Sequence, residues 1–257
     1  MPEGDTVWRT AHHLDQALSG QTLTGCDIRV PAFATLDLTG QPVRETVSRG
    51  KHLLTRIGDD HTLHTHLKME GSWHLYRHGR RWRRPPHQAR VVLRTDEWVA
   101  VGFSLGITEV VARDGEDTVV GHLGPDLLGA DWDEAEALRR LQCEPDRPIG
   151  EAILDQRNLA GVGNMYKSEI CFVQGVHPLV PTREVDLTRM VRRAKAVLEA
   201  NKHRVEQTTT GDLRRGQRLW VYRREGQPCR RCGTRIEVAD LDGRLTNWCP
   251  RCQPPPG

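Results

Sequence analysis

The chain contains 257 residues and carries a formal net charge of +3. This length is sufficient for two domains, or for one domain with an appendage. No run of about eighteen apolar residues is present and no basic region precedes an apolar core at the start, so we expect neither a membrane-spanning helix nor a secretory leader.

The charge is unevenly distributed along the chain. Residues 201–257 contain 12 Lys/Arg against 6 Asp/Glu, whereas the preceding residues carry a small negative balance. A basic end on a near-neutral body favours a polyanionic partner. A second basic cluster surrounds Trp82 and consists of Arg77, Arg80, Arg81, Arg83 and Arg84. These arginines could contact phosphate, although a solvated loop is the more common outcome for such a run.

The first residues, Met1-Pro2-Glu3-Gly4, suggest an unusual nucleophile. Once Met1 is removed, Pro2 presents a secondary amine that can attack an aldehyde-like carbon and form an iminium, which then acts as an electron sink. An α-amino group has a pKa of about 8, so much of it is neutral near pH 7. Glu3 is close enough to move protons. Many chains begin Met-Pro for easy processing, so this start alone decides nothing.

Apolar residues recur at helical spacing from Thr6 to Leu18, and Gly20 ends the pattern. This predicts an amphipathic helix with Pro2 and Glu3 at its entrance. Short β-type runs follow between about residues 22 and 112, including 53–57, 89–93 and 98–101. Many short strands separated by turns indicate a β-sandwich or a barrel.

Two segments in the β region contain candidate functional residues. Lys51 follows Ser48-Arg49-Gly50 at the start of a predicted strand. A lysine there is usually a solvated strand end, but beside an iminium site it could lower the pKa of the amine or bind a phosphate. In the segment 64–71, His64 and His66 alternate onto one face. Because no third ligand lies near them in the sequence, we favour packing or hydrogen bonding over a metal site.

After residue 122 the periodicity becomes helical. We expect helices over 133–141, 148–156, 164–173 and 187–200, separated by glycine-containing breaks. Gly161-Val162-Gly163 precedes Asn164 at the start of the third helix. Free amides at a helix start attract anions, and the Asn164 amide can donate one more hydrogen bond, so a backbone phosphate would fit there. Alone, this pattern is more often only a helix cap.

The last forty residues contain two cysteine pairs, Cys229-x-x-Cys232 and Cys249-x-x-Cys252, separated by sixteen residues. This spacing predicts one structural Zn²⁺ bound by all four thiolates in a reducing compartment. Four protein ligands leave no open position for chemistry. So short a segment cannot bury a sufficient core by itself, and the metal would supply the missing stability. Arg244, in the intervening hairpin, is expected to project toward a ligand.

In their order along the chain, these motifs resemble one family. Pro-Glu-Gly at the start, Arg-Gly-Lys-x-Leu-Leu near residue 50, His-Leu-x-Met-x-Gly near residue 70 and Gly-Val-Gly-Asn-x-Tyr before the paired cysteines are similar to the formamidopyrimidine-DNA glycosylase and endonuclease VIII family of base-excision repair enzymes. Pro-Glu-Gly-Asp-Thr points to the endonuclease VIII branch and its actinobacterial-type members.

The resemblance implies an α+β multidomain fold. An N-terminal helix and catalytic β-sandwich domain would span residues 1–122, a helix–two-turn–helix DNA-binding domain 126–214, and a C-terminal four-cysteine zinc-finger β-hairpin 216–257. The implied partner is damaged DNA, duplex or single-stranded, with no membrane involved. A monomer in the bacterial cytoplasm, associated with the nucleoid when bound to DNA, is expected.

The resemblance also assigns roles to single residues. Pro2 would attack C1′ of the damaged nucleoside, Glu3 would act as general acid and base, and Lys51 would assist near the lesion and bind a flanking phosphate. Asn164 and Arg244 would hold phosphates around the flipped nucleotide. Met69 would fill the gap left in the base stack. These last three residues are therefore the implied DNA-binding set, beside the four zinc ligands Cys229, Cys232, Cys249 and Cys252.

The chain departs from the family pattern in three places. Thr6 stands where the family commonly has a glutamate, and Lys68 and Glu70 flank Met69 where the endonuclease VIII type has Gln and Tyr. The segment 208–219 is short where oxidised-purine enzymes have a longer lesion-capping loop, which favours oxidised pyrimidines and abasic sites as substrates. The alternatives are a damaged-DNA-binding protein of the same fold without turnover, and a protein-binding zinc ribbon on an unrelated β-domain.

Overall fold

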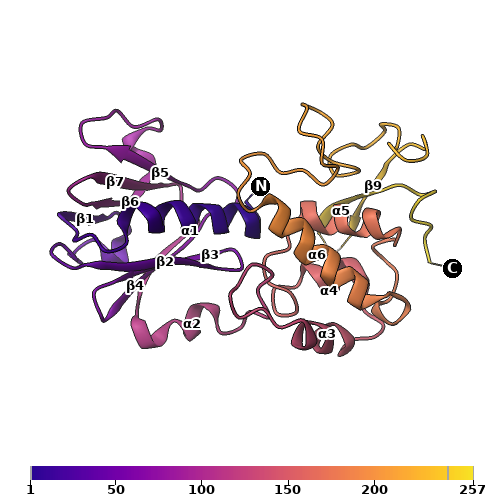
Figure 1. The fold of residues 1–257 in the computed structure, drawn as a ribbon, viewed down its shortest axis with the longest axis horizontal. Helices are drawn as coiled ribbons and strands as arrows, with labels where there is room; N and C mark the ends of the chain where they lie inside the picture. The colour runs from indigo at the N-terminus through magenta and orange to yellow at the C-terminus, as the bar shows by residue number, and fades with distance from the viewer. Residues whose placement is uncertain (1, 242, 257) are drawn as a thin grey trace. The chain divides into compact units, whose positions relative to one another are not determined.

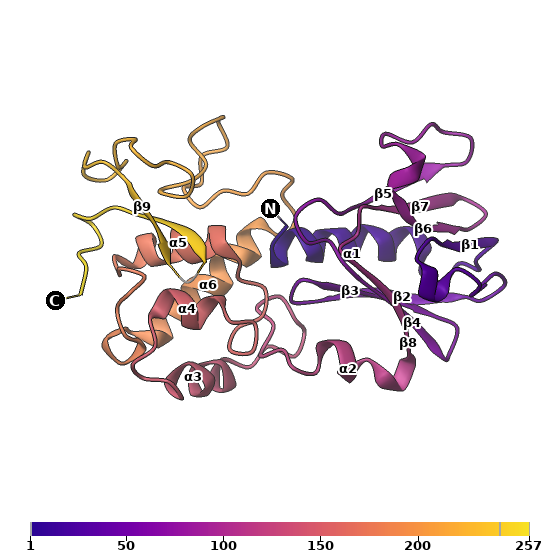
Figure 2. The ribbon, with the colours of Figure 1, turned by 180° about the vertical axis from the view of Figure 1, so that it is seen from behind.

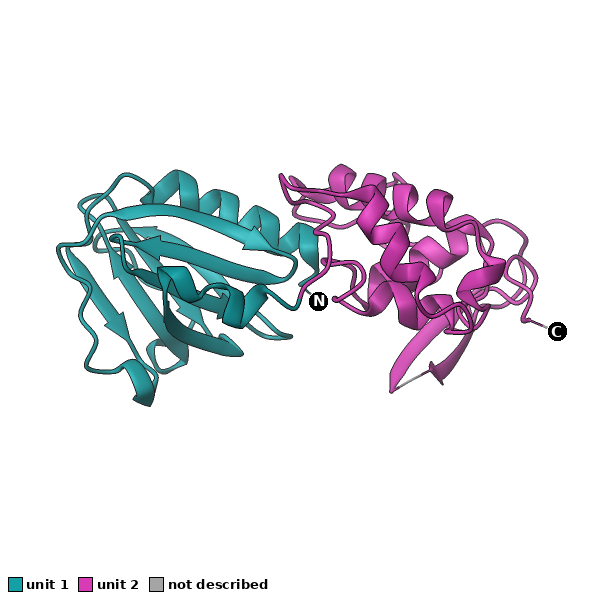
Figure 3. Cartoon of the chain, turned by 90° about the horizontal axis from the view of Figure 1, so that it is seen from below, with its two compact units in different colours: residues 1–122 teal, residues 123–257 magenta. Residues whose placement is uncertain are grey.

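The computed structural model describes residues 2–241 and 243–256. The chain forms two units, residues 1–122 and 123–257, and each is described by itself (Figure 3). None of the helices in the described ranges is both long enough and apolar enough to cross a membrane.

The first unit packs its long helix, α1, against two antiparallel sheets (Figure 1). Helix α1 covers Gly4–Leu18, which confirms the predicted amphipathic helix and extends it by two residues at its start. One sheet has the order β1-β6-β7-β5 and the other β2-β3-β4-β8. The strands are β1 (Gly25–Ile28), β2 (Val43–Arg49), β3 (His52–Ile57), β4 (His61–His66), β5 (Ser72–Arg77), β6 (Ala89–Arg94), β7 (Trp98–Phe103) and β8 (Ile107–Ala112).

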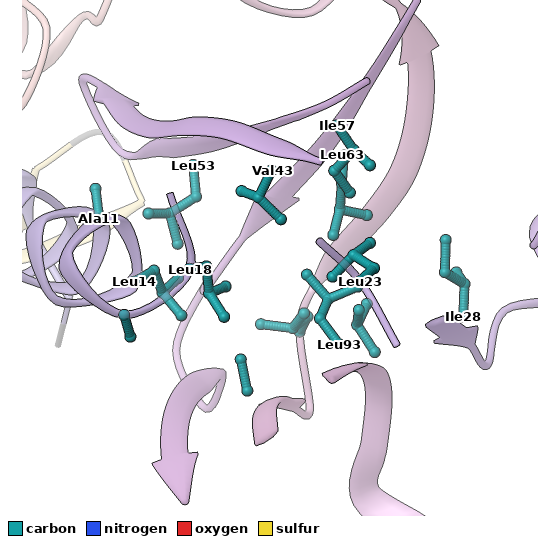
Figure 4. Packing of buried hydrophobic residues seen from close by; sticks show 14 of the residues in the cluster. Ala11, Leu14, Leu18, Leu23, Ile28, Val43, Leu53, Ile57, Leu63 and Leu93 are labelled. Atoms are coloured by element: carbon teal, nitrogen blue, oxygen red, sulfur yellow. The ribbon is translucent and has the colours of Figure 1, made fainter. Parts of the chain in front are cut away.

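A single apolar core joins α1 to both sheets (Figure 4). Leu14 and Leu18 of the helix are buried in one cluster with Leu53 of β3 and Leu93 of β6. Each such side chain contributes roughly 1.5–3 kcal/mol through burial. The predicted β-sandwich is therefore correct, because apolar residues from the facing sides of two sheets share this core.

Alternate residues of β6 and β7 face away from that core and form a second cluster with Tyr76 and Phe103. Trp82, from the segment between β5 and β6, packs against this outer cluster, and its ring meets that of Phe103 edge-on at 5.7 Å. Trp82 thus anchors the segment 78–88 to the outer face of the sheet.

The second unit contains four longer helices and a hairpin (Figures 1 and 2). The helices are α3 (Glu134–Gln142), α4 (Ile149–Leu154), α5 (Asn164–Gln174) and α6 (Leu187–Asn201), and the hairpin pairs β9 (Glu237–Leu241) with β10 (Arg244–Trp248). Helix α5 is buried on all sides from Asn164 to Phe172 and contacts α4, α6 and β10. Gly175 ends α5 in the left-handed conformation, at the break expected from the sequence.

Two local predictions need correction. Helix α4 ends at Leu154 and does not reach residue 156, because the Asp155 carboxylate accepts a hydrogen bond from the Arg157 amide at 3.0 Å and starts a turn there. A short helix, α2 (Asp117–Val120), follows the sandwich and was not predicted. It is a single turn with no buried residue, so no apolar periodicity reveals it.

Candidate active site and metal centre

Pro2 and Glu3 lie at the entrance to α1. Glu3 is the N-cap residue, with extended backbone angles, and its carbonyl accepts a hydrogen bond from the Val7 amide at 3.0 Å. The Glu3 side chain is fully buried, at 0% exposure, whereas Pro2 is half-buried. A carboxylate in this position is stabilised by the positive end of the helix dipole. The fold therefore places a buried acid directly after the residue that would carry the terminal amine.

Strand register brings the Lys51 turn and the Met69 turn to one end of the sandwich. Arg49 and His52 are opposite each other across the β2–β3 turn that contains Lys51. His52 also pairs with His66, the last residue of β4. The turn that carries Met69 therefore begins beside His52. The β2–β3 turn also lies at the same end as the first turn of α1 (Figures 1 and 2).

Met69 occupies the tip of a tight turn. The Gly71 amide donates to the Leu67 carbonyl at 2.8 Å, and a Cβ at position 71 would lie 2.4 Å from that oxygen, so only glycine fits. Lys68 adopts a positive φ of 50°, and Met69 is 61% exposed. An apolar side chain held out by a closed turn has the form of a wedge.

A hydrogen-bonded chain of side chains runs across the strands behind the Lys51 turn. His52 Nδ1 and His64 Nε2 lie 2.8 Å apart, and His64 Nδ1 lies 2.7 Å from Glu109 Oε1. The Glu109 carboxylate therefore accepts a hydrogen bond from the Nδ1–H of His64, which leaves His64 Nε2 to accept from the Nδ1–H of His52 and fixes the orientation of both rings. The predicted hydrogen-bonding role of His64 is confirmed, and His66 and His122 lie edge-on to His52.

Burial is the main cause that lowers the pKa of His52 to about 3 and the pKa of His66 to about 4. Repulsion by neighbouring histidines and by Lys68 lowers both pKa values further, and Lys51 adds to the effect on the pKa of His66. Both rings are therefore neutral at pH 7 in the folded protein.

We expect the free energy of unfolding to fall as the pH drops from about 6.5 to about 4. Below pH 6.5 the unfolded chain binds protons on these histidines, and the folded chain does not until the pH approaches 3 to 4. Thermal unfolding of wild type and His52→Gln at several pH values would measure this, and the variant should lose stability less steeply. Identical slopes would contradict the assignment.

The glycine loop before α5, residues 161–163, is held by hydrogen bonds with Gln156. The Gln156 side chain donates to the carbonyls of Leu154 and Val162, and its oxygen accepts from the Gly161 amide at 3.0 Å. Gly161 has a positive φ of 109°, a backbone conformation that residues with a Cβ atom rarely adopt. Gly163 caps the helix, so the first amides of α5 follow an ordered loop.

Asn164 joins this loop to the hairpin. Its Nδ2 donates to the Leu245 carbonyl of β10 at 2.8 Å, while its Oδ1 is buried and makes no hydrogen bond with a described residue. One of the two Nδ2 hydrogens is thus used on the hairpin, which fixes the orientation of the Asn164 side chain. Arg244, which opens β10, is exposed, and its guanidinium makes no hydrogen bond with any residue that the structure describes.

Two buried charged residues of α5 attach it to the C-terminal segment. Glu169 is fully buried, and its carboxylate accepts from the amides of Trp220, Val221 and Tyr222, each at 2.8 Å, and from the Thr209 hydroxyl. Lys167, also buried, donates to the Thr246 hydroxyl at 2.6 Å. Neither residue was singled out in the sequence, because partners about forty to eighty positions away leave no local pattern.

Glu169→Gln is expected to destabilise the second unit by about 2–4 kcal/mol, because the new NH2 group faces donors and leaves buried amides unpaired. The rate of zinc release to a chelator reports this directly and should rise in the variant. Glu184→Gln is the matched control, since Glu184 is exposed in a surface ion pair. Equal release rates in the wild type and Glu169→Gln would show that the carboxylate does not hold this segment.

The four cysteines form a metal centre of the expected geometry. The sulfur atoms of Cys229, Cys232, Cys249 and Cys252 all lie within 4.8 Å of one another, and in the described residues no other group of potential metal ligands gathers in this way. Cys232 Sγ lies 3.4 Å from Cys249 Sγ, and Cys229 Sγ lies 4.0 Å from Cys252 Sγ. A tetrahedral Zn²⁺ with bonds of about 2.3 Å requires sulfur separations of about 3.8 Å, far above the 2.05 Å of a disulfide.

Hydrogen bonds around the cysteines orient the two ligand turns. The Arg231 amide donates to Cys229 Sγ at 3.4 Å. Gln253 is fully buried, accepts from the Cys249 amide at 3.0 Å and donates to the Val176 carbonyl beyond α5. These contacts hold one structural zinc against the helical part of the unit, and such a closed site with four cysteine ligands performs no chemistry.

Three domain families match the chain in order. They are the formamidopyrimidine-DNA glycosylase N-terminal domain over residues 1–105, the formamidopyrimidine-DNA glycosylase H2TH domain over 123–212, and the zinc finger found in FPG and IleRS over 226–255.

Curated relatives match over the full length. The "Probable endonuclease 8 2" of Streptomyces coelicolor is 52% identical and covers 100% of this chain and 95% of the relative. The "DNA-(apurinic or apyrimidinic site) lyase Nei2" of Mycolicibacterium smegmatis is 50% identical, with 98% and 99% coverage. Among solved structures, the complex of Lactococcus lactis Fpg with abasic-site DNA superposes with a TM-score of 0.81 over 99% of this chain and 100% of that one, at 23% identity, which supports the fold.

Proposed function

Because the chain belongs to the formamidopyrimidine-DNA glycosylase and endonuclease 8 family, we propose that it is a bifunctional DNA glycosylase and abasic-site lyase of base-excision repair. The observation that carries this proposal is the full-length similarity to relatives named endonuclease 8 and abasic-site lyase, in a chain that keeps Pro-Glu at the start of α1. Its partner is damaged DNA, and its site of action is the bacterial cytoplasm, on the nucleoid when bound.

The proposed reaction starts at the Pro2 amine. Its nitrogen attacks C1′ of a flipped nucleotide, the bond from C1′ to the base breaks, and the bonding electrons leave with the base. Glu3 protonates the sugar ring oxygen, the ring opens, and C1′ and Pro2 remain joined as an iminium. Loss of a C2′ proton then expels the 3′ phosphate, and δ-elimination expels the 5′ phosphate. The buried position of Glu3 suits an acid that must exchange protons out of contact with water.

The other residues are proposed to hold the DNA. Lys51 would bind a phosphate beside the reacting sugar, and Met69 would enter the gap left by the flipped nucleotide. Asn164, at the start of α5, and Arg244, with its exposed guanidinium, would bind flanking phosphates. We retain 1–122, 126–214 and 216–257 as the catalytic, helical and zinc-finger segments, acting within a monomer. Oxidised pyrimidines are the favoured lesions.

Borohydride trapping tests the proposal directly. The untagged protein, with removal of Met1 verified by mass, is mixed with an oligonucleotide containing an abasic site in the presence of borohydride. We expect a covalent adduct that peptide mapping places on Pro2. Binding to abasic DNA without any adduct would favour the alternative, a non-catalytic damaged-DNA-binding protein, to which the loss of the family glutamate at Thr6 already points.

A further inference from the structure

The segment between β5 and β6 contains the strongest concentration of unpaired positive charge in the described part of the first unit. No Asp or Glu occurs between Glu70 and Asp96, whereas that stretch contains seven arginines. Arg77 bonds to Glu97, and Arg84 donates to uncharged acceptors. The side chains of Arg80, Arg81 and Arg83 are exposed and make no hydrogen bond or ion pair with any residue in the described ranges.

The loop is held in place despite its exposed charges. Trp82 packs on Phe103 and lies under the Arg29 guanidinium, 5.9 Å from the ring centroid. The Arg83 amide donates to the Tyr76 hydroxyl at 3.0 Å, and Pro85-Pro86 restricts the following backbone. Burial alternates along this stretch: Trp82 and Arg84 point inward, while Arg81 and Arg83 are exposed. Anchoring of the intervening residues therefore presents the arginines outward, and a hollow lined by Arg29 and residues 80–86 lies among them.

Arg84 connects this loop to the turn that carries Met69. Its Nη1 donates to the Glu70 carbonyl at 2.9 Å and to Ser72 Oγ at 3.0 Å, and its Nε donates to Gln88 at 3.0 Å. The arginine loop and the Met69 turn are thus parts of one bonded surface. A ligand that receives Met69 brings its backbone close to the loop.

We propose that Arg80, Arg81 and Arg83 form a phosphate-binding surface that extends the DNA contact of the first unit beyond the lesion. This inference rests on the proposed function, because the proposed insertion of Met69 into the base stack is what would bring a DNA backbone to the loop. No carboxylate among the described residues pairs with these three guanidinium groups, so they repel one another in the free protein, and phosphates would relieve that repulsion. Arginine also binds phosphate oxygens in a bidentate geometry that lysine cannot match.

The salt dependence of DNA affinity tests this surface. Each phosphate contact contributes about 0.9 to the slope of log Kd against log salt concentration. Removing three contacts in Arg80→Ala/Arg81→Ala/Arg83→Ala should therefore lower the slope by about 2.7. Between 50 and 200 mM salt, wild type should lose about 40-fold more affinity than the variant. The probe is a duplex containing a tetrahydrofuran abasic analogue, which the lyase reaction cannot cleave.

A charge-matched control distinguishes the effect of the loop from the effect of a lower net charge. Arg44→Ala/Arg139→Ala/Arg192→Ala removes the same three charges from exposed side chains that each bond to a carboxylate, so its slope should stay near that of wild type. The triple lysine variant of the loop should keep most of the slope. A wild-type slope in the loop alanine variant, or an equal loss in the control, would overturn the proposal and leave an acidic protein surface as the remaining partner.

Borohydride trapping in parallel keeps the two proposals distinct. The loop lies outside the reacting groups, so its alanine variant should still form the adduct at low salt. If wild type forms no adduct, the proposed function fails, while the salt slope still measures the loop. If wild type forms the adduct but wild type and the loop alanine variant have equal salt slopes, only the phosphate-binding surface is refuted.

Discussion

An N-terminal extension that remains attached to Pro2 is expected to abolish both adduct formation and strand cleavage. The Pro2 nitrogen then becomes an amide, whose lone pair is delocalised and cannot attack C1′. We expect the rate of abasic-site cleavage to fall by at least about 10³-fold, the scale on which loss of a nucleophile acts. The measurement is single-turnover cleavage of abasic DNA, with binding followed in parallel by fluorescence anisotropy. DNA affinity should change little, because phosphate contacts supply most of it.

The same extension placed at the C-terminus is the control and should leave cleavage intact. Glu3→Gln tests the role of the proton donor while leaving the Pro2 amine intact. The variant keeps a nearly isosteric side chain in a fully buried position. Removing a general acid–base group typically lowers a rate by about 10²–10⁴-fold. Cleavage at the wild-type rate with Pro2 acylated would show that another amine performs the reaction.

Local sequence patterns predicted much of this molecule. The apolar spacing of α1 follows directly from helix periodicity, and the short apolar runs of β6 and β7 are typical of buried strands. The paired cysteines predicted their own clustering, because two pairs of thiolate ligands, each pair separated by two residues on one turn, allow few other arrangements. The motifs around Pro2, Lys51 and Asn164 identified the family without any structural information.

Contacts between distant segments were not predictable in this way. The chain from Glu109 through His64 to His52 depends on the register of three strands, and one residue of slip would turn these side chains to the other face. The Glu169 carboxylate binds three consecutive amides about fifty residues further along, a pairing that no sequence spacing encodes. These contacts form only when tertiary packing brings the segments together.

Removal of zinc is expected to unfold the C-terminal segment, because its apolar core is too small to keep it folded without the metal. The apolar cluster there is small and includes two of the zinc ligands themselves: Phe172, Val221, Cys229, Ile236 and Cys249. Structural zinc contributes about 10–16 kcal/mol of binding free energy in zinc-finger peptides. Treatment with a strong chelator should make residues 220–256 sensitive to trypsin and increase their rate of amide exchange. The first unit, whose core is separate, should remain protected.

Single substitutions make the zinc prediction specific. Cys249→Ser removes a fully buried ligand and should reproduce the effect of chelation, whereas Cys143→Ser removes an exposed thiol outside the cluster and should have no effect. Unfolding of the hairpin would also release Arg244 and the Leu245 carbonyl that binds Asn164, so affinity for abasic-site DNA should fall together with zinc content. Zinc-free protein that binds this DNA normally and resists trypsin would show that the Glu169 and Gln253 contacts maintain the segment without the metal. If Cys249→Ser loses both its resistance to trypsin and its affinity for abasic-site DNA, and Cys143→Ser loses neither, one metal supports both the fold of this segment and its binding to DNA.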